Sequence, residues 1–254
     1  MNGIKNVLGR LFALWALLIF VSSILIVALL CWIIGWWPEP KSSKMSHVVF
    51  EVWMGFFFFM TGVRRTYKGR EHFEKGQNYI VVCNHNTYVD VLMESPATPG
   101  PNKTIAKTEM ARIPIFGVVY KRGSVLVDRK SEESRKKSYL QMKDVLLKLG
   151  LHMCIYPEGT RNKTGAPLQR FHDGAFRLAV DTQKPIIPSL IFNTKKVLPL
   201  HKTFYFWPHP VEMHFLPPVY PNGKDKNQLK EEVFDIMYRH YVEHNESSVQ
   251  SSKL

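Results

Sequence analysis

The sequence predicts an α/β fold in which a mixed sheet is flanked by helices and preceded by an N-terminal hydrophobic helical hairpin. Two observations carry this prediction. Short β-rich apolar segments alternate with longer segments of helical periodicity between residues 64 and 244. Ahead of them lie two apolar segments, 11–37 and 45–62. The chain has 254 residues, enough for one such domain and an appendage.

The first apolar segment is predicted to enter a membrane. Residues 11–37 contain no Asp, Glu, Lys or Arg, and a helix rising about 1.5 Å per residue over that length can cross a hydrocarbon core of roughly 30 Å. A cleavable signal peptide has a shorter apolar core, of about 7 to 15 residues. The segment also ends in the bulky CWIIGWWPEP rather than in small residues. We therefore expect it to remain in the mature protein.

The second apolar segment completes the expected hairpin. It contains His47 and Glu51, so a re-entrant or interfacial helix is an alternative to a second span. Pro38 and Pro40 lie between the two segments and favour a turn. We expect residues 1–63 to form a membrane-associated hairpin whose two ends lie on the same side of the bilayer.

The charge of the chain indicates a lipid surface. The formal net charge is +13. Basic residues beside an apolar segment favour its cytoplasmic side and attract anionic lipid, so we expect a membrane protein with its active site on the cytoplasmic face. Nucleic-acid binding is the other use of such charge, but no helix-turn-helix, RNA-binding or finger motif accompanies it, and no nucleic-acid partner is predicted. The flanking basic residues are Lys5, Arg10, Lys41, Lys44, Arg64, Arg65, Lys68 and Arg70.

The three cysteines, Cys31, Cys83 and Cys154, are predicted to be small buried residues in a reducing compartment. Their number is odd, their spacing is not that of a zinc site, and each lies in an apolar run. No disulfide framework is expected.

The α/β domain is predicted to cover residues 64–244, followed by a disordered polar tail at 245–254. Its expected strands are 79–83, 103–107, 124–128, 152–156, 185–192 and 211–216. Its expected helices are 89–93, 131–149, 174–182 and 227–244, of which the second starts at a capping Ser131.

A histidine and an aspartate follow the first of these strands, in NHNTYVD. His85 and Asp90 are five residues apart, which on a helix is about 140° around the axis, so they meet only if the chain turns sharply between strand and helix. An aspartate bonded to one imidazole nitrogen leaves the other as a base, worth roughly 10²- to 10⁴-fold in rate. The alternative is that Asn84 or Thr87 caps a helix and His85 is an exposed loop residue.

Two other chemistries at this loop are less well supported. A metal site is not predicted, because His85 and Asp90 have no H-E-x-x-H or C-x-x-C partner. Cys83 is a poor candidate nucleophile, because two residues along a strand place it roughly 6.6 Å from His85. No G-x-S-x-G motif offers a serine instead.

Two further strand ends carry charged residues. Asp128 and Arg129 follow one strand, and the run PEGTR follows another. In that run, Gly159 allows close backbone approach to a ligand and Arg161 offers a planar fork of donors to a phosphate or carboxylate. Each strand end alone also suits an ordinary surface turn. Together they predict a site, because ligands gather beyond the carboxyl ends of strands in open α/β sheets.

These motifs resemble the glycerolipid acyltransferase family, and within it the enzymes acting on 1-acyl-sn-glycerol 3-phosphate. The similarity extends over about residues 64 to 220 and keeps the order and approximate spacing of four blocks. The first is N-H-x4-D, the second G-x4-D-R, the third P-E-G-T-R, and the fourth an apolar segment ending in proline. They match Asn84, His85 and Asp90; Gly123, Asp128 and Arg129; Pro157, Glu158, Gly159, Thr160 and Arg161; and Ile186, Ile187 and Pro188.

The resemblance implies transfer of a fatty acyl group from acyl-CoA or acyl carrier protein to the sn-2 hydroxyl of 1-acylglycerol 3-phosphate, giving phosphatidic acid. His85 would act as general base and Asp90 would stabilise its imidazolium form. No metal and no cofactor beyond the acyl donor is implied, and the partners are membrane lipid, a lysophospholipid acceptor and the donor. The implied substrate-binding residues are Lys107, Arg129, Glu158, Gly159, Thr160 and Arg161.

One block departs from the family. Many members read F-K-K-G after the third block, whereas this chain has Phe171, His172, Asp173 and Gly174. Arg170 and Arg177 are candidates to replace the missing positive charge. The alternatives are therefore another lysolipid or glycerol 3-phosphate as acceptor, a membrane-anchored esterase, or a non-catalytic membrane lipid-binding protein.

Overall fold

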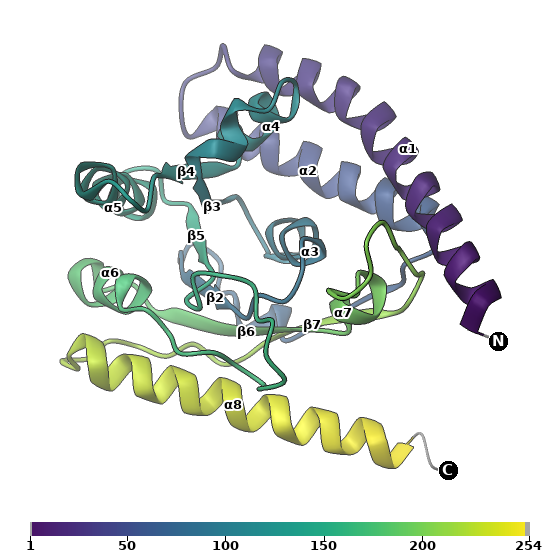
Figure 1. Ribbon diagram of the computed structural model, residues 1–254. Helices are drawn as coiled ribbons and strands as arrows, with labels where there is room; N and C mark the ends of the chain where they lie inside the picture. The colour runs from purple at the N-terminus through teal and green to yellow at the C-terminus, as the bar shows by residue number, and fades with distance from the viewer. Residues whose placement is uncertain (1, 252–254) are drawn as a thin grey trace.

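The computed structural model describes residues 2–251 and begins with the expected hairpin. Helix α1 (Asn2–Ile34) and helix α2 (Lys41–Met60) lie side by side (Figure 1). Pro38 and Pro40 lie in the turn between them, as predicted. Two indole N–H groups join the helices, because Trp53 donates to the hydroxyl of Ser23 and Trp15 donates to the carbonyl of Met60, each at 2.8 Å.

The hairpin is packed on the rest of the protein and presents an apolar outer side. The backbone N–H of Phe206 donates to the carbonyl of Gly9 at 3.0 Å, which fastens the start of α1 to the α/β domain. Of the described residues, one helix is long and apolar enough to cross a membrane, α1 over Gly3–Ile34. An exposed apolar side of this extent is typical of a membrane contact. It includes Leu11, Leu14, Leu18, Val21, Leu25 and Leu29 of α1, and Val48, Val52, Phe56 and Phe59 of α2.

The domain is built on a seven-stranded mixed sheet with the order β1-β7-β6-β2-β5-β3-β4. Strands β6, β2, β5, β3 and β4 run parallel to one another, β7 is antiparallel to β6, and β1 is parallel to β7. The α/β class and the mixed sheet are thus as predicted. The strands are β1 (Arg65–Lys68), β2 (Ile80–Cys83), β3 (Asn102–Lys107), β4 (Ser124–Val127), β5 (His152–Ile155), β6 (Ile186–Phe192) and β7 (Val211–Phe215).

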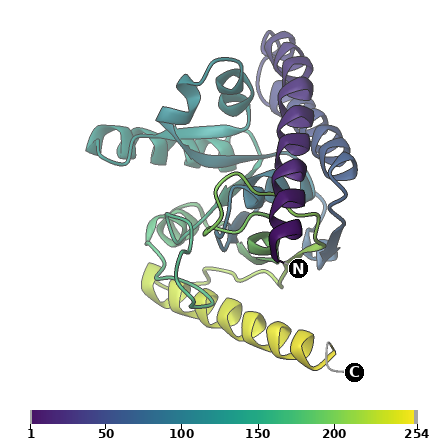
Figure 2. The ribbon, with the colours of Figure 1, turned by 45° about the vertical axis from the view of Figure 1, so that its right-hand side comes forward.

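Helices cover both faces of the sheet and enclose two apolar cores (Figures 1 and 2). One core joins the sheet to the hairpin, α3, α4 and α7, and the other joins it to α5, α6 and α8. Strands β2, β5 and β6 are consequently apolar or small at nearly every position and buried on both faces. The remaining helices are η1 (Arg70–His72), α3 (Val89–Ala97), η2 (Thr108–Arg112), α4 (Phe116–Arg122), α5 (Glu132–Leu147), α6 (Gly174–Thr182), α7 (Thr194–Val197) and α8 (Lys226–Ser251).

The chain end differs from the expected tail. Helix α8 continues to Ser251, so residues 245–251 are helical, and 252–254 lie outside the described residues. No Gly or Pro interrupts the sequence from Lys226 to Ser251, which removes the usual reasons for a helix to stop. Strand β1 and helix α4 were not predicted either. The first is a short, largely polar edge strand, and the second lacks a capping side chain.

Candidate functional site

The candidate site lies at one edge of the sheet. Since β2, β3, β4, β5 and β6 are parallel, their carboxyl ends meet at this edge. The loops after β2, β4, β5 and β6 carry the polar motifs that the sequence singles out. The fold therefore brings together residues that are up to about a hundred positions apart.

His85 and Asp90 form a hydrogen-bonded pair. The loop after β2 turns sharply into α3, and Nδ1 of His85 lies 2.9 Å from Oδ2 of Asp90. The Asp90 side chain is fully buried, whereas 16% of the His85 side chain is exposed. An acceptor at Nδ1 fixes the tautomer that carries its proton there, so Nε2 is left as a base.

Asp90 is held in place by four other donors. Its Oδ2 accepts backbone N–H bonds from Asn86 and from Thr87, the second at 2.7 Å. Its Oδ1 accepts from the hydroxyl of Thr194 at 2.6 Å and from that of Thr87 at 3.5 Å. These bonds stabilise the carboxylate form inside the protein, and they fix the acceptor that orients His85.

Tyr156 and Glu158 support the histidine from the loop after β5. The ring of Tyr156 stacks on the imidazole of His85 with centroids 4.3 Å apart. One carboxylate oxygen of Glu158 accepts the backbone N–H of His85 at 2.9 Å, and the other accepts that of Gln169 at 3.0 Å. Burial raises the pKa of Glu158. Glu158 thus lies at the site as expected, but its oxygens are committed to the backbone rather than directed at a substrate.

The P-E-G-T-R loop brings two arginines next to the histidine. The guanidinium of Arg161 lies 4.0 Å from the ring centre of Tyr88, in the loop that carries His85, and the carbonyl of His85 accepts the N–H of Asn162 at 2.6 Å. Arg129, after β4, donates to the carbonyl of Gly159. Gly159 has φ of +69°, and a Cβ there would lie 2.8 Å from the ring of His172, so a glycine is required.

The two remaining predicted substrate-binding residues lie at the same edge. Lys107 is the last residue of β3, and Thr160 follows Gly159. Both side chains are exposed to solvent. Their positions fit contact with a bound ligand.

The segment that departs from the family pattern divides between two sides of the sheet. His172 is exposed and lies over Gly159. Asp173 is paired with Lys230 at 2.7 Å and with Lys226, both on α8, and these amines lower the pKa of its carboxyl to about 2. Arg177 packs on Tyr139 of α5 at 5.2 Å. Of the nearby positive groups, Arg177 therefore points away from the site, and His172 stands at the position nearest to it.

Sequence reasoning missed two contributors. Thr194 follows β6 and has no motif of its own. Glu94 is fully buried on α3, and burial raises the pKa of its carboxyl to about 8. A glutamate three to four residues after Asp90 on the same helix was a signal for a second carboxyl behind the pair.

Cys83 is not placed as a nucleophile. Its side chain has no exposed surface, and burial raises the pKa of its thiol well above the ordinary value. A thiol that resists ionisation is a weak nucleophile. The three cysteines are all buried and unpaired, as predicted.

Comparisons with known proteins agree with this geometry. A family model described as Acyltransferase matches residues 64–191. The chain is 31% identical over 166 residues to human 1-acyl-sn-glycerol-3-phosphate acyltransferase alpha, covering 65% of this chain and 58% of that protein. It is 29% identical over 155 residues to the 1-acyl-sn-glycerol-3-phosphate acyltransferase of Salmonella typhimurium, covering 61% and 62%. The chain thus spans less than two thirds of these relatives.

A solved structure shares the fold. The crystal structure of the 1-acyl-sn-glycerophosphate (LPA) acyltransferase PlsC from Thermotoga maritima superposes with a TM-score of 0.76 at 22% identity, covering 96% of this chain and 98% of that one. The match includes the hairpin as well as the sheet, because nearly the whole chain is covered. Since the family model spans half of the chain and contains the His85, Arg129 and Arg161 loops, the chain belongs to the acyltransferase family.

Proposed function

We propose that this protein transfers a fatty acyl group from a thioester donor to the sn-2 hydroxyl of 1-acylglycerol 3-phosphate, giving phosphatidic acid. The observation that carries the proposal is the bond from Nδ1 of His85 to the buried carboxylate of Asp90, beside two arginines. The names of the relatives in human and Salmonella support the same acceptor.

His85 acts as the general base in this proposal. Nε2 takes the proton of the acceptor hydroxyl as that oxygen bonds to the thioester carbonyl carbon. The carbon–sulfur bond then breaks, and the thiolate leaves and recovers the proton. A thiol with an ordinary pKa near 8.5 is a good leaving group, so no covalent serine or cysteine is required. Asp90 stabilises the imidazolium that forms between these steps.

The acceptor's phosphate binds to the basic side of the site. Arg161 and Arg129 provide guanidinium groups, and Lys107 and Thr160 provide donors at the same edge. A bidentate arginine fixes the position of a phosphate and hence of the hydroxyl on the same glycerol. His172, exposed above Gly159, is an additional donor at the position where the family has lysine.

The substrates reach the site from a membrane surface. The outward apolar side of α1 and α2 supports contact with the hydrocarbon region, and the basic residues that flank the hairpin favour the cytoplasmic face. The contacts of α1 with the α/β domain along its length support a hairpin that stays attached to the domain. Acyl-CoA and acyl carrier protein are both donors that approach from the cytoplasm.

An acceptor and donor panel tests the proposal. The purified full chain in detergent is given acyl-CoA or acyl carrier protein as donor, with 1-acylglycerol 3-phosphate, a zwitterionic lysophospholipid or glycerol 3-phosphate as acceptor. We expect the highest kcat/KM with 1-acylglycerol 3-phosphate. A preference for another acceptor would reassign the headgroup. Thioester hydrolysis that is equally fast without an acceptor would indicate an esterase.

A further inference from the structure

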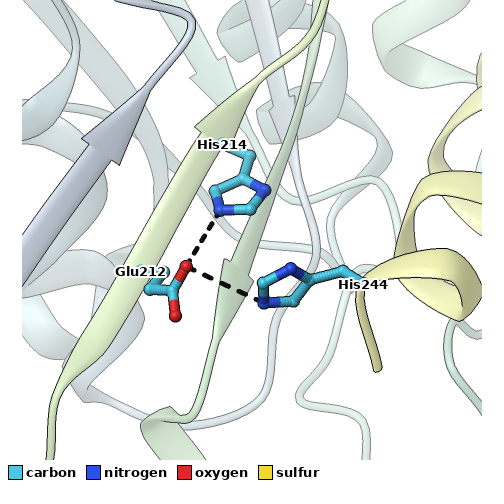
Figure 3. A group of neighbouring side chains, drawn as sticks. All are labelled: Glu212, His214 and His244. Atoms are coloured by element: carbon cyan, nitrogen blue, oxygen red, sulfur yellow. Dashed lines mark hydrogen bonds and ion pairs between the residues drawn. The ribbon is translucent and has the colours of Figure 1, made fainter. Parts of the chain in front are cut away.

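A second polar cluster lies between strand β7 and helix α8. Glu212 and His214 are two residues apart on β7 and so point to the same face of the sheet. His240 and His244 are four residues apart on α8, in the run HYVEH, and so lie on one side of the helix. The two pairs face each other (Figure 3).

Three of these side chains present one ligand atom each to a common point. Oε2 of Glu212 lies 3.2 Å from Nε2 of His214 and 3.8 Å from Nε2 of His244, and the three ligand atoms lie within 4.8 Å of one another. Metal–ligand distances near 2.0 to 2.1 Å in a tetrahedral zinc site imply ligand atoms about 3.4 Å apart. Shifts of a few tenths of an ångström to about 1.5 Å bring this set to that spacing.

The surroundings orient the cluster as a metal site requires. Nδ1 of His214 lies 2.8 Å from Nε2 of His240, which leaves Nε2 of His214 directed at Glu212. Metal-binding histidines usually make such a bond with the other ring nitrogen. The buried ring of Phe192 packs on His214 and His244, with centroids 5.0 and 4.2 Å apart, and excludes water from one side.

A metal ion can reach the cluster from solvent. A surface cavity of about 380 Å³ is lined by His214, His240 and His244 together with Lys68 and His72. The amine of Lys68 lies 3.6 Å from Oε2 of Glu212, and its side chain is 58% exposed. An exposed lysine of this kind is weakly held and can leave when a divalent cation binds.

We propose that Glu212, His214 and His244 bind a Zn²⁺ ion that fastens α8 to β7, with His240 orienting His214. Two imidazoles and one carboxylate are the protein ligands of many three-ligand zinc sites, in which water fills the fourth position. Hard cations such as Mg²⁺ prefer oxygen donors and are disfavoured by this set. The site shares no residue with the acyltransferase site.

The test is metal titration of the full chain, purified in detergent with an affinity tag that contains no histidine and treated with chelator. Isothermal titration calorimetry with Zn²⁺ is expected to show one ion per chain, with Kd of micromolar or below and a rise in Tm on loading. Mg²⁺ is expected to give neither. Absence of zinc binding to the wild type at 100 μM would overturn the proposal.

Matched variants assign the ligands. His244→Ala and Glu212→Gln are chosen because both side chains are partly exposed and the variants should fold. Each is expected to weaken zinc binding at least tenfold, whereas His72→Ala, in the same cavity but outside the cluster, should bind as the wild type does. Wild-type affinity in His244→Ala and Glu212→Gln, or an equal loss in His72→Ala, would refute the assignment.

Discussion

The hydroxyl of Thr194 donates a hydrogen bond of 2.6 Å to Oδ1 of Asp90 across 104 positions of sequence. Thr194 follows β6, and Asp90 lies at the start of α3 after β2. The bond forms because β6 and β2 are adjacent parallel strands whose ends meet. The neighbouring strand thus helps to position the carboxylate that orients His85.

Thr194→Val is expected to lower kcat without unfolding the protein. The loss of one hydrogen bond to a charged group, about 1.5 kcal/mol, corresponds to a fall in kcat of roughly tenfold, with KM for the acceptor little changed. Thr194→Ser, which keeps the hydroxyl, is the control and should retain most of the activity. Wild-type kcat in Thr194→Val would show that this bond does not contribute to the reaction.

Arg161→Ala is expected to raise KM for 1-acylglycerol 3-phosphate by roughly 10- to 100-fold, the effect of losing a charge-assisted contact of about 1.5 to 3 kcal/mol. KM for the acyl donor should change little. Initial-rate measurements with each substrate varied in turn separate the two effects.

Arg177→Ala is the matched control for this prediction. Arg177 packs on Tyr139, away from the site, so removal of its charge should leave both KM values near those of the wild type. A change in KM confined to the donor in Arg161→Ala would reverse the assignment of the substrates.

Glu94→Gln is expected to change how stability depends on pH. The buried carboxyl has a pKa of about 8 in the folded protein against an ordinary value of 4.5. Between these values the folded state holds a proton that the unfolded chain releases, so stability falls as pH rises from about 4.5 to 8, by at most about 1.4 kcal/mol per pH unit. Glutamine carries no such proton, and the variant should lose this part of the slope.

Denaturant unfolding of wild type and Glu94→Gln at pH 5, 6, 7 and 8 measures the difference. The readout is the slope rather than the stability at one pH, because an amide in place of a carboxyl also changes local contacts. Parallel pH profiles of the two proteins would show that Glu94 is ionised in the folded state.

Much of the site could be predicted because its residues directly follow apolar runs. A strand that ends at Cys83 or Ile155 places the next polar residues at the sheet edge, and a parallel sheet puts those ends together. This argument located His85, Arg129 and Arg161 without knowledge of the strand order. It also located the hairpin, because uncharged segments of that length have few other uses.

Other features depend on tertiary contacts that leave no local pattern. Thr194 has no motif, and its role exists only because β6 lies beside β2. Glu158 has the composition of a substrate-binding residue, but the fold directs both of its oxygens to backbone N–H groups. The histidines of α8 are two potential ligands in sequence, and the pair on β7 that completes the cluster becomes adjacent only in the folded protein.

The central claim is that His85 is the base, and it is tested most directly by His85→Ala in the purified-protein assay with 1-acylglycerol 3-phosphate and acyl-CoA. We expect kcat/KM to fall by roughly 10²- to 10⁴-fold, with an unchanged circular dichroism spectrum and unchanged binding to lipid vesicles. Cys83→Ala, at the buried end of the same strand, should remain active. Turnover by folded His85→Ala within a few fold of the wild type would contradict the account.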